Sequence, residues 1–260
     1  MKLAEMSIKE IRDLLEKMDE VPKDFLQWLH EDKRKGVNEL ARQVEQQQAR
    51  QARLASQWEE MTTFERSLRA EGYTHLFGID EVGRGPLAGP VVAAAVCLPA
   101  DFYLPGLNDS KKLPAATREA FAEVIRSKAL AVGIGIVSAE RIDEINILEA
   151  TKEAMRLAIK EAARTVSPDA CLLDAVQLKD LPYKQLPIIG GDGKSVSIAA
   201  ASVVAKVTRD QIMSEYAAAY PQYSFEKNAG YGTAEHLTAL ERYGMTPIHR
   251  RTFTGAKAQA

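Results

Sequence analysis

The sequence predicts an α/β fold in which a mixed β-sheet is flanked by helices, with an α-helical N-terminal extension. From about residue 73, short apolar runs bounded by glycine and polar residues alternate with longer helical patterns. Residues 1–70 are instead rich in Glu, Lys, Arg and Gln and contain a single glycine. Apolar residues make up 46% of the 260-residue chain, which is enough to build a core.

The extension, residues 1–70, is expected to hold three helices. Apolar residues at helical spacing from Ile8 to Met18 predict the first, and Ser7 followed by Glu10 has the pattern of a capping box. A second helix is expected through Phe25 to Leu29. The third, over about 37–70, is long and polar with sparse apolar positions, which is typical of a linker helix with one docked face.

The second domain, residues 71–260, is expected to fold and act without the extension. Its elements follow in order: strands at about 74–80, 89–98, 130–138 and 170–175, and helices at about 115–129, 146–164, 197–219 and 234–243. A tight glycine-containing connection joins the first two strands, which favours an antiparallel pair. Helices separate the later strands, which favours parallel crossovers.

Charge, cysteine usage and hydropathy limit the possible classes of protein. The net charge of −2 counts mildly against nucleic-acid binding, although local patches can override it. Cys97 and Cys171 lie in apolar runs and are expected to be buried thiols. No apolar stretch is long enough for a membrane span, and the first residues lack the apolar segment of a signal peptide. We therefore expect a cytoplasmic monomer that does not bind membranes.

Four acidic residues stand at strand ends or at a helix start. Asp80 and Glu81 follow an apolar run, Asp174 follows Leu-Leu, and Asp192 lies in a Gly-Gly-Asp-Gly-Lys-Ser segment before a long helix. Any one of them could instead cap a helix or form a surface ion pair. An acid that ends a buried strand is costly unless it is paired or binds a metal. Neighbours on a strand point to opposite faces, so Asp80 and Glu81 can share metals only if the strand bends or ends there.

Four converging carboxylates predict a two-metal hydrolytic site. Two cations about 3.5–4 Å apart would hold the attacking water and the leaving oxygen of an in-line displacement. Mg²⁺ or Mn²⁺ suits ligands that are all oxygen atoms. The four histidines show no zinc-binding pattern and are expected to be surface or packing residues: His30, His75, His236 and His249.

Several segments could contact phosphate. Gly83-Arg84-Gly85 offers backbone N–H groups and one guanidinium, and Lys111 lies in an Asp-Ser-Lys-Lys-Leu segment that could equally be a solvated helix start. Gly-Lys-Ser at 193–195 invites a P-loop interpretation. The first required residue of that motif is a glycine, and this chain has Ile188 there. This mismatch excludes a nucleotide-binding NTPase of the P-loop type.

Two further features could face the site. Ser202, Lys206 and Arg209 share one face of the helix that follows Asp192, where they could face the site or pair with nearby acids. Tyr231 stands between two glycines, where it could stack on a sugar or base. The alternative for Tyr231 is a turn tyrosine packed on the next helix.

Together these motifs resemble bacterial ribonuclease HII, of the type 2 ribonuclease H family. The matching segments occur in family order across residues 73–254: GIDEVGRGPLAGP, DSKKL, LLDA, GDGKS, IAAASVVAKVTRD and KNAGYGT. The extension departs from the many family members that start close to the first motif, and no role for it follows from the resemblance.

The resemblance implies an RNase H-like fold and an activity. Asp80, Glu81, Asp174 and Asp192 would bind the catalytic metals. The Gly83–Gly85 segment would read the ribonucleotide 2′-hydroxyl and a phosphate, with glycine letting the backbone approach closely, and Lys111, Ser202 and Lys206 would assist binding. Tyr231 would stack on the next deoxyribose. The implied reaction cuts 5′ of a ribonucleotide in duplex DNA, or the RNA of RNA/DNA hybrids, leaving 5′-phosphate and 3′-hydroxyl ends.

Two alternatives remain at the level of sequence. A ribonuclease HIII-like, hybrid-specific nuclease would have a sheet-forming N-terminal domain and would lack the tyrosine. A non-catalytic nucleic-acid-binding protein on the same fold would gain nothing from four acids near phosphate. Mg²⁺-dependent cleavage of a duplex with one ribonucleotide would separate an enzyme from a binding protein.

Overall fold

The computed structural model describes residues 5–18 and 20–253, which pack as two units that divide between Gln57 and Trp58. The first unit holds α1 (Ile8–Leu15), α2 (Lys23–Glu31) and most of α3 (Lys35–Met61). The predicted capping box is present at α1, because Ser7 and Glu10 exchange side-chain to backbone hydrogen bonds. Apolar residues of all three helices form one small core that includes Ile11, Leu29 and Val37.

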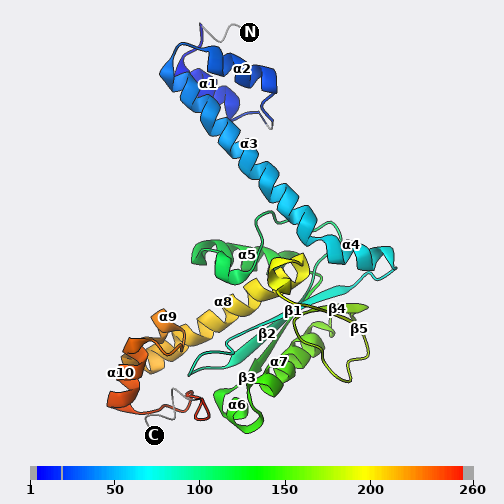
Figure 1. Cartoon of the computed structure of the whole chain (residues 1–260), viewed down its shortest axis with the longest axis vertical. Coiled ribbons are helices and arrows are strands. Elements are labelled where there is room, and N and C mark those ends of the chain that lie inside the picture. The colour runs from blue at the N-terminus through cyan, green and yellow to red at the C-terminus, as the bar shows by residue number, and fades with distance from the viewer. Residues whose placement is uncertain (1–4, 19, 254–260) are drawn as a thin grey trace. The chain divides into compact units, whose positions relative to one another are not determined.

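The second unit is built on a five-stranded mixed sheet of order β3-β2-β1-β4-β5 (Figure 1). Its strands are β1 (Leu76–Val82), β2 (Val91–Cys97), β3 (Ala131–Val137), β4 (Ala170–Asp174) and β5 (Lys184–Ile188). As predicted, β1 and β2 form an antiparallel pair. The strands β4 and β5 run parallel to β1, but β3 pairs antiparallel with β2, so the expected parallel crossover is wrong for β3.

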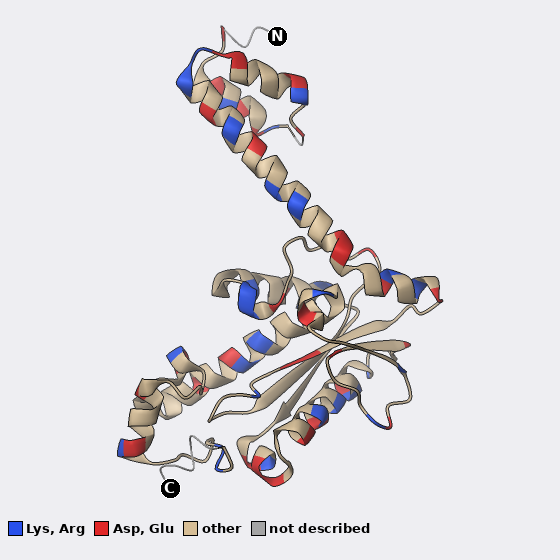
Figure 2. Cartoon of the chain, viewed as in Figure 1, with Lys and Arg blue, Asp and Glu red and all other residues tan. Residues whose placement is uncertain are grey.

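Helices cover both faces of this sheet. The helix α7 (Ile147–Ala162) packs on one face in a core with Phe77 and Ile79 of β1. The helices α8 (Val196–Ala219) and α5 (Ala115–Lys128) pack on the other. The sheet is thus an almost uncharged layer between charged helices, as Figure 2 shows. The remaining helices are α4 (Thr63–Ala70), α6 (Ala139–Ile145), α9 (Phe225–Asn228) and α10 (Ala234–Tyr243).

The long polar helix expected over 37–70 is instead two helices, α3 and α4, with a break at Thr62. The hydroxyl of Thr62 donates to the carbonyl oxygen of Glu59, and that of Thr63 donates to the carbonyl of Glu60. These side chains compete with backbone hydrogen bonds at the break. The short strand β5 escaped sequence reasoning because it is a half-exposed edge strand that contains Pro187.

The second unit includes residues 58–70, which the sequence assigned to the extension. Trp58, Met61 and Leu68 are buried in it. Whether 1–70 and 71–260 behave as separate folding domains stays a prediction. Cys97 and Cys171 are buried and free, as expected. Across the described residues, no helix combines the length and apolar character that a membrane span requires.

Candidate active site

The candidate site lies at the carboxyl ends of β1, β4 and β5, where three parallel strands end at one edge. Ile79 of β1 is in register with Leu173 of β4, so the next residues, Asp80 and Asp174, stand side by side. After β5, the single turn Gly191–Gly193 carries Asp192 to the same edge. Gly190 enters that turn in the left-handed conformation that glycine adopts easily. Ligand sites in sheets with parallel strands form at such edges.

Hydrogen bonds link these acids to the backbone. The Gly191 N–H donates to Oδ1 of Asp174 at 2.7 Å, which ties the Asp192 turn to the end of β4. Oδ1 of Asp80 accepts the Glu81 N–H at 2.8 Å. Nζ of Lys111 lies 3.8 Å from Oδ2 of Asp192.

Asp80 and Glu81 point to opposite faces, because β1 continues past them to Val82. Asp80, almost fully buried, faces α8, where Ser202 hydrogen-bonds it. Glu81 lies toward the other face, where Arg84 Nη1 is 3.3 Å from Oε1. The strand ends one residue after Glu81, and the carboxylate of Asp174 raises the pKa of both Asp80 and Glu81, so both acids lie near Asp174 although they point to opposite faces. Among residues 5–18 and 20–253, no three His, Cys, Asp or Glu side chains are already grouped as metal ligands.

The acids are held in an environment that disfavours their charge. Burial raises the pKa of Asp80 well above its usual value, and the carboxylates of Glu81 and Asp174 raise it further. Burial also raises the pKa of Glu81, against the lowering effect of Arg84. Asp192 has a raised pKa through burial and the carboxylates of Asp109 and Asp174. A nearby cation would stabilise the charged form of each of these carboxylates.

A divalent cation fits this donor set. The potential ligands are all carboxylate oxygens, which Mg²⁺ and Mn²⁺ prefer. Oε2 of Glu81 is buried and has no hydrogen-bond partner in the described structure. An orphaned buried carboxylate oxygen is costly, and a metal ligand bond would satisfy it. The assignment of all four acids as ligands stays a prediction.

Two buried arginines hold the Gly83–Gly89 loop beside the acids by donating hydrogen bonds to its carbonyl oxygens. Arg250 donates to the carbonyl oxygens of Gly83, Arg84 and Gly89. Arg209 donates to the carbonyls of Pro90, Ala88 and Ala229. Burial, and next the charge of Arg209, lower the pKa of Arg250 to about 9. Arg209 therefore binds carbonyl oxygens, and the expected pairing with acids is wrong for it.

The two glycines of the Gly-Arg-Gly segment have different roles. Gly83 has a φ of 92°, and a Cβ atom there would collide with the Arg209 side chain. Glycine at 83 is therefore required by the interior of the loop, and the expected need for room beside a substrate stays a prediction. A Cβ on Gly85 would lie at an ordinary 3.5 Å from Cε1 of Tyr231. No backbone hydrogen-bond partner occurs within the described residues for the N–H groups of Arg84 and Gly85.

Tyr231 lies beside Gly85, although the two are far apart in sequence. Its side chain is 47% exposed, so it is not a core residue. The N–H groups of Leu87 and Ala88 both bond to the carbonyl oxygen of Gly230, which fixes the tyrosine loop against the glycine loop.

The remaining predicted substrate contacts divide into two groups. The hydroxyl of Ser202 lies 3.0 Å from that of Ser110, which brings the Ser110–Lys112 turn and Lys111 to the site. Lys206 instead forms a 2.6 Å ion pair with Asp210 on its own helix. The structure thus gathers Lys111 and Ser202 near the acids and gives Lys206 a partner of its own.

Sequence reasoning missed a buried histidine pair behind Tyr231. Nδ1 of His249 accepts the Thr246 N–H, so its Nε2 carries the proton and donates to Nε2 of His236 at 3.0 Å. Nδ1 of His236 then donates to the carbonyl of Tyr231 at 2.8 Å. These two histidines are packing residues as expected, but they act as a pair and not singly. Spacing alone offered no signal, because α10 and the C-terminal segment meet only in the fold.

The comparisons with known proteins agree across the chain. The family model described as "Ribonuclease HII" matches residues 77–256, and "Ribonuclease HII N-terminal domain" matches residues 7–69. The chain is 50% identical over 255 residues to Ribonuclease HII of Enterococcus faecalis, covering 98% of this chain and 99% of that protein. It is 52% identical over 248 residues to Ribonuclease HII of Bacillus subtilis, covering 95% and 96%.

A solved structure with the same architecture is ribonuclease H2 from Pyrococcus horikoshii. It superimposes with a TM-score of 0.60 at 26% identity, covering 70% of this chain and 95% of that one. The N-terminal family model supplies a relative for the extension that the sequence motifs did not.

Proposed function

The chain belongs to the ribonuclease HII family and is a ribonuclease H enzyme, and from this premise we propose its reaction. It hydrolyses the phosphodiester bond 5′ of a ribonucleotide embedded in duplex DNA, and the RNA strand of RNA/DNA hybrids. The products carry 5′-phosphate and 3′-hydroxyl ends. The observation that carries the proposal is the meeting of Asp80, Asp174 and Asp192 at one sheet edge, beside the Gly83–Gly85 loop.

The proposed cofactors are two Mg²⁺ or Mn²⁺ ions held by Asp80, Glu81, Asp174 and Asp192. When bound, such ions supply an activated water and stabilise charge on the leaving oxygen. Burial and mutual repulsion of these carboxylates support the assignment, as does the unpartnered Oε2 of Glu81. Lys111 beside Asp192 would offset part of the negative charge when a phosphate approaches.

The proposed substrate contacts lie on the Gly83–Gly85 loop and on Tyr231. The N–H groups of Arg84 and Gly85, for which residues 5–18 and 20–253 supply no backbone partner, can donate to a phosphate or to the ribose 2′-hydroxyl. The Arg84 side chain is 48% exposed and can reach a phosphate. Because the exposed Tyr231 ring adjoins Gly85, it can press on the sugar next to the ribonucleotide and sense an RNA–DNA junction. Ser202 and Lys206 complete the proposed binding residues.

We further propose that the enzyme acts as a monomer in the cytoplasm, where its DNA substrate would be found. Sedimentation at several protein concentrations and fractionation of cells that express a tagged chain test these two points.

The deciding experiment is a cleavage assay on three duplexes of one sequence: one ribonucleotide in DNA, an RNA/DNA hybrid, and all DNA. We expect Mg²⁺- or Mn²⁺-dependent cutting of the first two and none of the third, with the cut 5′ of the ribonucleotide. Ligation and phosphatase treatment of the products identify their ends. Binding of the first duplex without cleavage in either metal would instead indicate a non-catalytic nucleic-acid-binding protein.

A further inference from the structure

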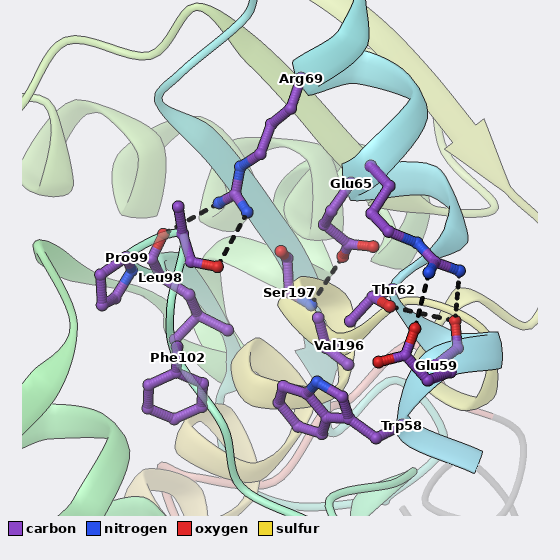
Figure 3. A pocket seen from close by; sticks show the side chains of 12 residues that line it. Trp58, Glu59, Thr62, Glu65, Arg69, Leu98, Pro99, Phe102, Val196 and Ser197 are labelled. Atoms are coloured by element: carbon purple, nitrogen blue, oxygen red, sulfur yellow. Dashed lines mark hydrogen bonds and ion pairs between the residues drawn. The ribbon is translucent and has the colours of Figure 1, made fainter. Parts of the chain in front are cut away.

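A buried carboxylate from α4 reaches the start of α8, close to the site. Oε1 of Glu65 accepts the Ser195 hydroxyl at 2.6 Å and the Ser197 N–H at 2.9 Å. Glu65 is only 3% exposed, and Ser195 and Ser197 are buried as well. Figure 3 shows the Glu65 side chain directed at Ser197 across the boundary between α4 and α8.

This contact continues through hydrogen bonds to two of the proposed metal ligands. The Ser195 N–H donates to the carbonyl oxygen of Gly191 at 2.9 Å, closing the turn that holds Asp192. The Gly191 N–H donates to Asp174 at 2.7 Å. Glu65, the Asp192 turn and Asp174 therefore form one connected chain of hydrogen bonds.

The first turn of α8 is packed more tightly against β1 than against α4. Against β1 there is no room, because a Cβ on Gly78 would collide with the backbone of Ser197. On the side of α4, a cavity of about 180 Å³ adjoins Val196 and Ser197, and its walls include Trp58, Phe102 and Arg69 (Figure 3). On this side Val196 shares an apolar cluster with Trp58, and Ile198 shares one with Leu68; the Glu65 hydrogen bonds add a polar restraint at Ser195 and Ser197.

Burying the Glu65 carboxylate costs free energy, which indicates that its hydrogen bonds have a structural or functional role. Oε2 of Glu65 is buried without a hydrogen-bond partner in the described structure. Arg69, one turn along α4, directs its guanidinium to the carbonyl oxygens of Leu98 and Ala100. The positive end of the long helix α8 and the two hydrogen bonds at Oε1 offset part of this cost.

We propose that Glu65 is a positioning residue for the reaction: it holds the start of α8 and the Asp192 turn in the geometry that binds metal. The proposal rests on the proposed function, since it takes Asp192 and Asp174 as metal ligands. It also gives residues 58–70 a role in the catalytic unit, because Glu65 belongs to this segment. The same residue lies within the segment matched by the N-terminal family model.

The test compares full-length variants. Glu65→Ala removes the acceptor, whereas Glu65→Gln keeps one oxygen for Ser195 and Ser197 and serves as the conservative rescue. Glu60→Ala, an exposed acid at the end of α3, is the matched control. Three quantities are measured: Mn²⁺ affinity of the free protein by electron paramagnetic resonance, amide exchange of residues 191–197 without metal, and the Mg²⁺ concentration for half-maximal cleavage.

We expect Glu65→Ala to weaken Mn²⁺ binding and raise the Mg²⁺ requirement about tenfold, with little change in KM for the duplex. Amide exchange over 191–197 should accelerate. Glu65→Gln should stay within about threefold of the parent, and Glu60→Ala should match it. Ser195→Ala should change these quantities in the same direction, and the double variant should lose less than the sum of the two single ones, because the Ser195 hydroxyl is one of the two donors to Glu65 and also caps α8.

The proposal is overturned if Glu65→Ala lowers only the melting temperature and leaves Mn²⁺ affinity and exchange over 191–197 unchanged. It is also overturned if Glu65→Ala is indistinguishable from Glu60→Ala. A failure of the proposed function looks different: the parent protein would neither bind Mn²⁺ nor cleave, while the exchange experiment would still report whether Glu65 holds the turn.

Discussion

Among single residues, Asp80 is one whose charge conflicts with its surroundings. It is buried between β1 and α8, and the carboxylates of Glu81 and Asp174 lie nearby. A group in this position destabilises the free protein and becomes useful only with a cation beside it. Tyr231 is exposed instead, so it contributes little to the core and leaves its ring available to a ligand. The two residues therefore call for different tests.

Asp80→Asn is expected to remove at least about 99% of cleavage activity, because it takes one anionic ligand from a site that works by charge stabilisation. The melting temperature should stay equal or rise, since an amide keeps the bond from the Glu81 N–H and carries no buried charge. Single-turnover cleavage and thermal unfolding measure both effects. Near-normal turnover in a folded variant would contradict the metal assignment.

Tyr231→Ala is expected to reduce kcat/KM on the single-ribonucleotide duplex by about tenfold or more, the size of a lost stacking contact. The RNA/DNA hybrid should be affected much less, because it has no deoxyribose after the ribonucleotide. Tyr231→Phe keeps the ring and is the control. If the ratio of kcat/KM on the two substrates is the same for Tyr231→Ala and the parent, Tyr231 does not sense the junction.

At the scale of elements, the site depends on how loops are fastened to the sheet. The glycine loop after β1 is fastened by Arg209 of α8 and by Arg250 of the C-terminal segment, through carbonyl oxygens. The tyrosine loop is fastened to α10 and the same segment by His236 and His249. Elements from the end of the chain therefore support the motif near its first strand.

The histidine pair predicts a specific loss of stability in acid. Burial, and next the nearby His236, lower the pKa of His249 to about 4. The unfolded chain thus binds the proton more readily, so the stabilising effect is full above about pH 6.5 and is lost as the pH falls toward 4. From pH 7.5 to 5, wild type should lose about 2 kcal/mol more unfolding free energy than His249→Gln.

Urea unfolding at the two pH values measures this difference. His30→Gln, at an exposed histidine of the first unit, should follow wild type and controls for the loss of a titratable group. Comparing variants cancels the carboxylates with raised pKa, which act in the opposite direction as the pH falls. Parallel pH profiles for wild type and His249→Gln would show that the pair is not held neutral by the fold.

At the scale of the whole molecule, the two packing units do not coincide with the boundary suggested by composition. Trp58, Met61 and Leu68 lie in the polar segment of the sequence but are buried against the catalytic unit. Trp58 packs edge-to-face on Tyr103 with ring centroids 5.3 Å apart. The segment 58–70 therefore covers part of the core on which the site is built.

Two truncated chains distinguish a domain boundary at Trp58 from one at residue 70. A chain starting at Trp58 should fold cooperatively and cleave, with a higher KM for duplex if the first unit assists binding. A chain starting at Glu71 should be less stable by several kcal/mol, because it exposes core that three buried apolar side chains would cover at about 1.5–3 kcal/mol each. Thermal unfolding and cleavage assays of both chains measure these differences. Equal stability would support the boundary at residue 70 expected from the sequence.

The sequence by itself determined the α/β class, the extension, the capping box at Ser7 and the family. These follow from local spacing and from motifs that lie within single segments. It also selected Asp80, Asp174 and Asp192 as residues at element ends, which the strand register then brought to one edge.

Only the tertiary structure decided what those residues meet. The pairing of β3, the contact of Glu65 with the start of α8, the two arginines beneath the glycine loop and the histidine pair all join segments distant in sequence. None has a local signature, because a hydrogen bond between distant elements depends on how they pack and not on spacing along the chain. Gly83 makes the same point: its motif marked it as special, but the buried side chain of Arg209 supplies the physical reason.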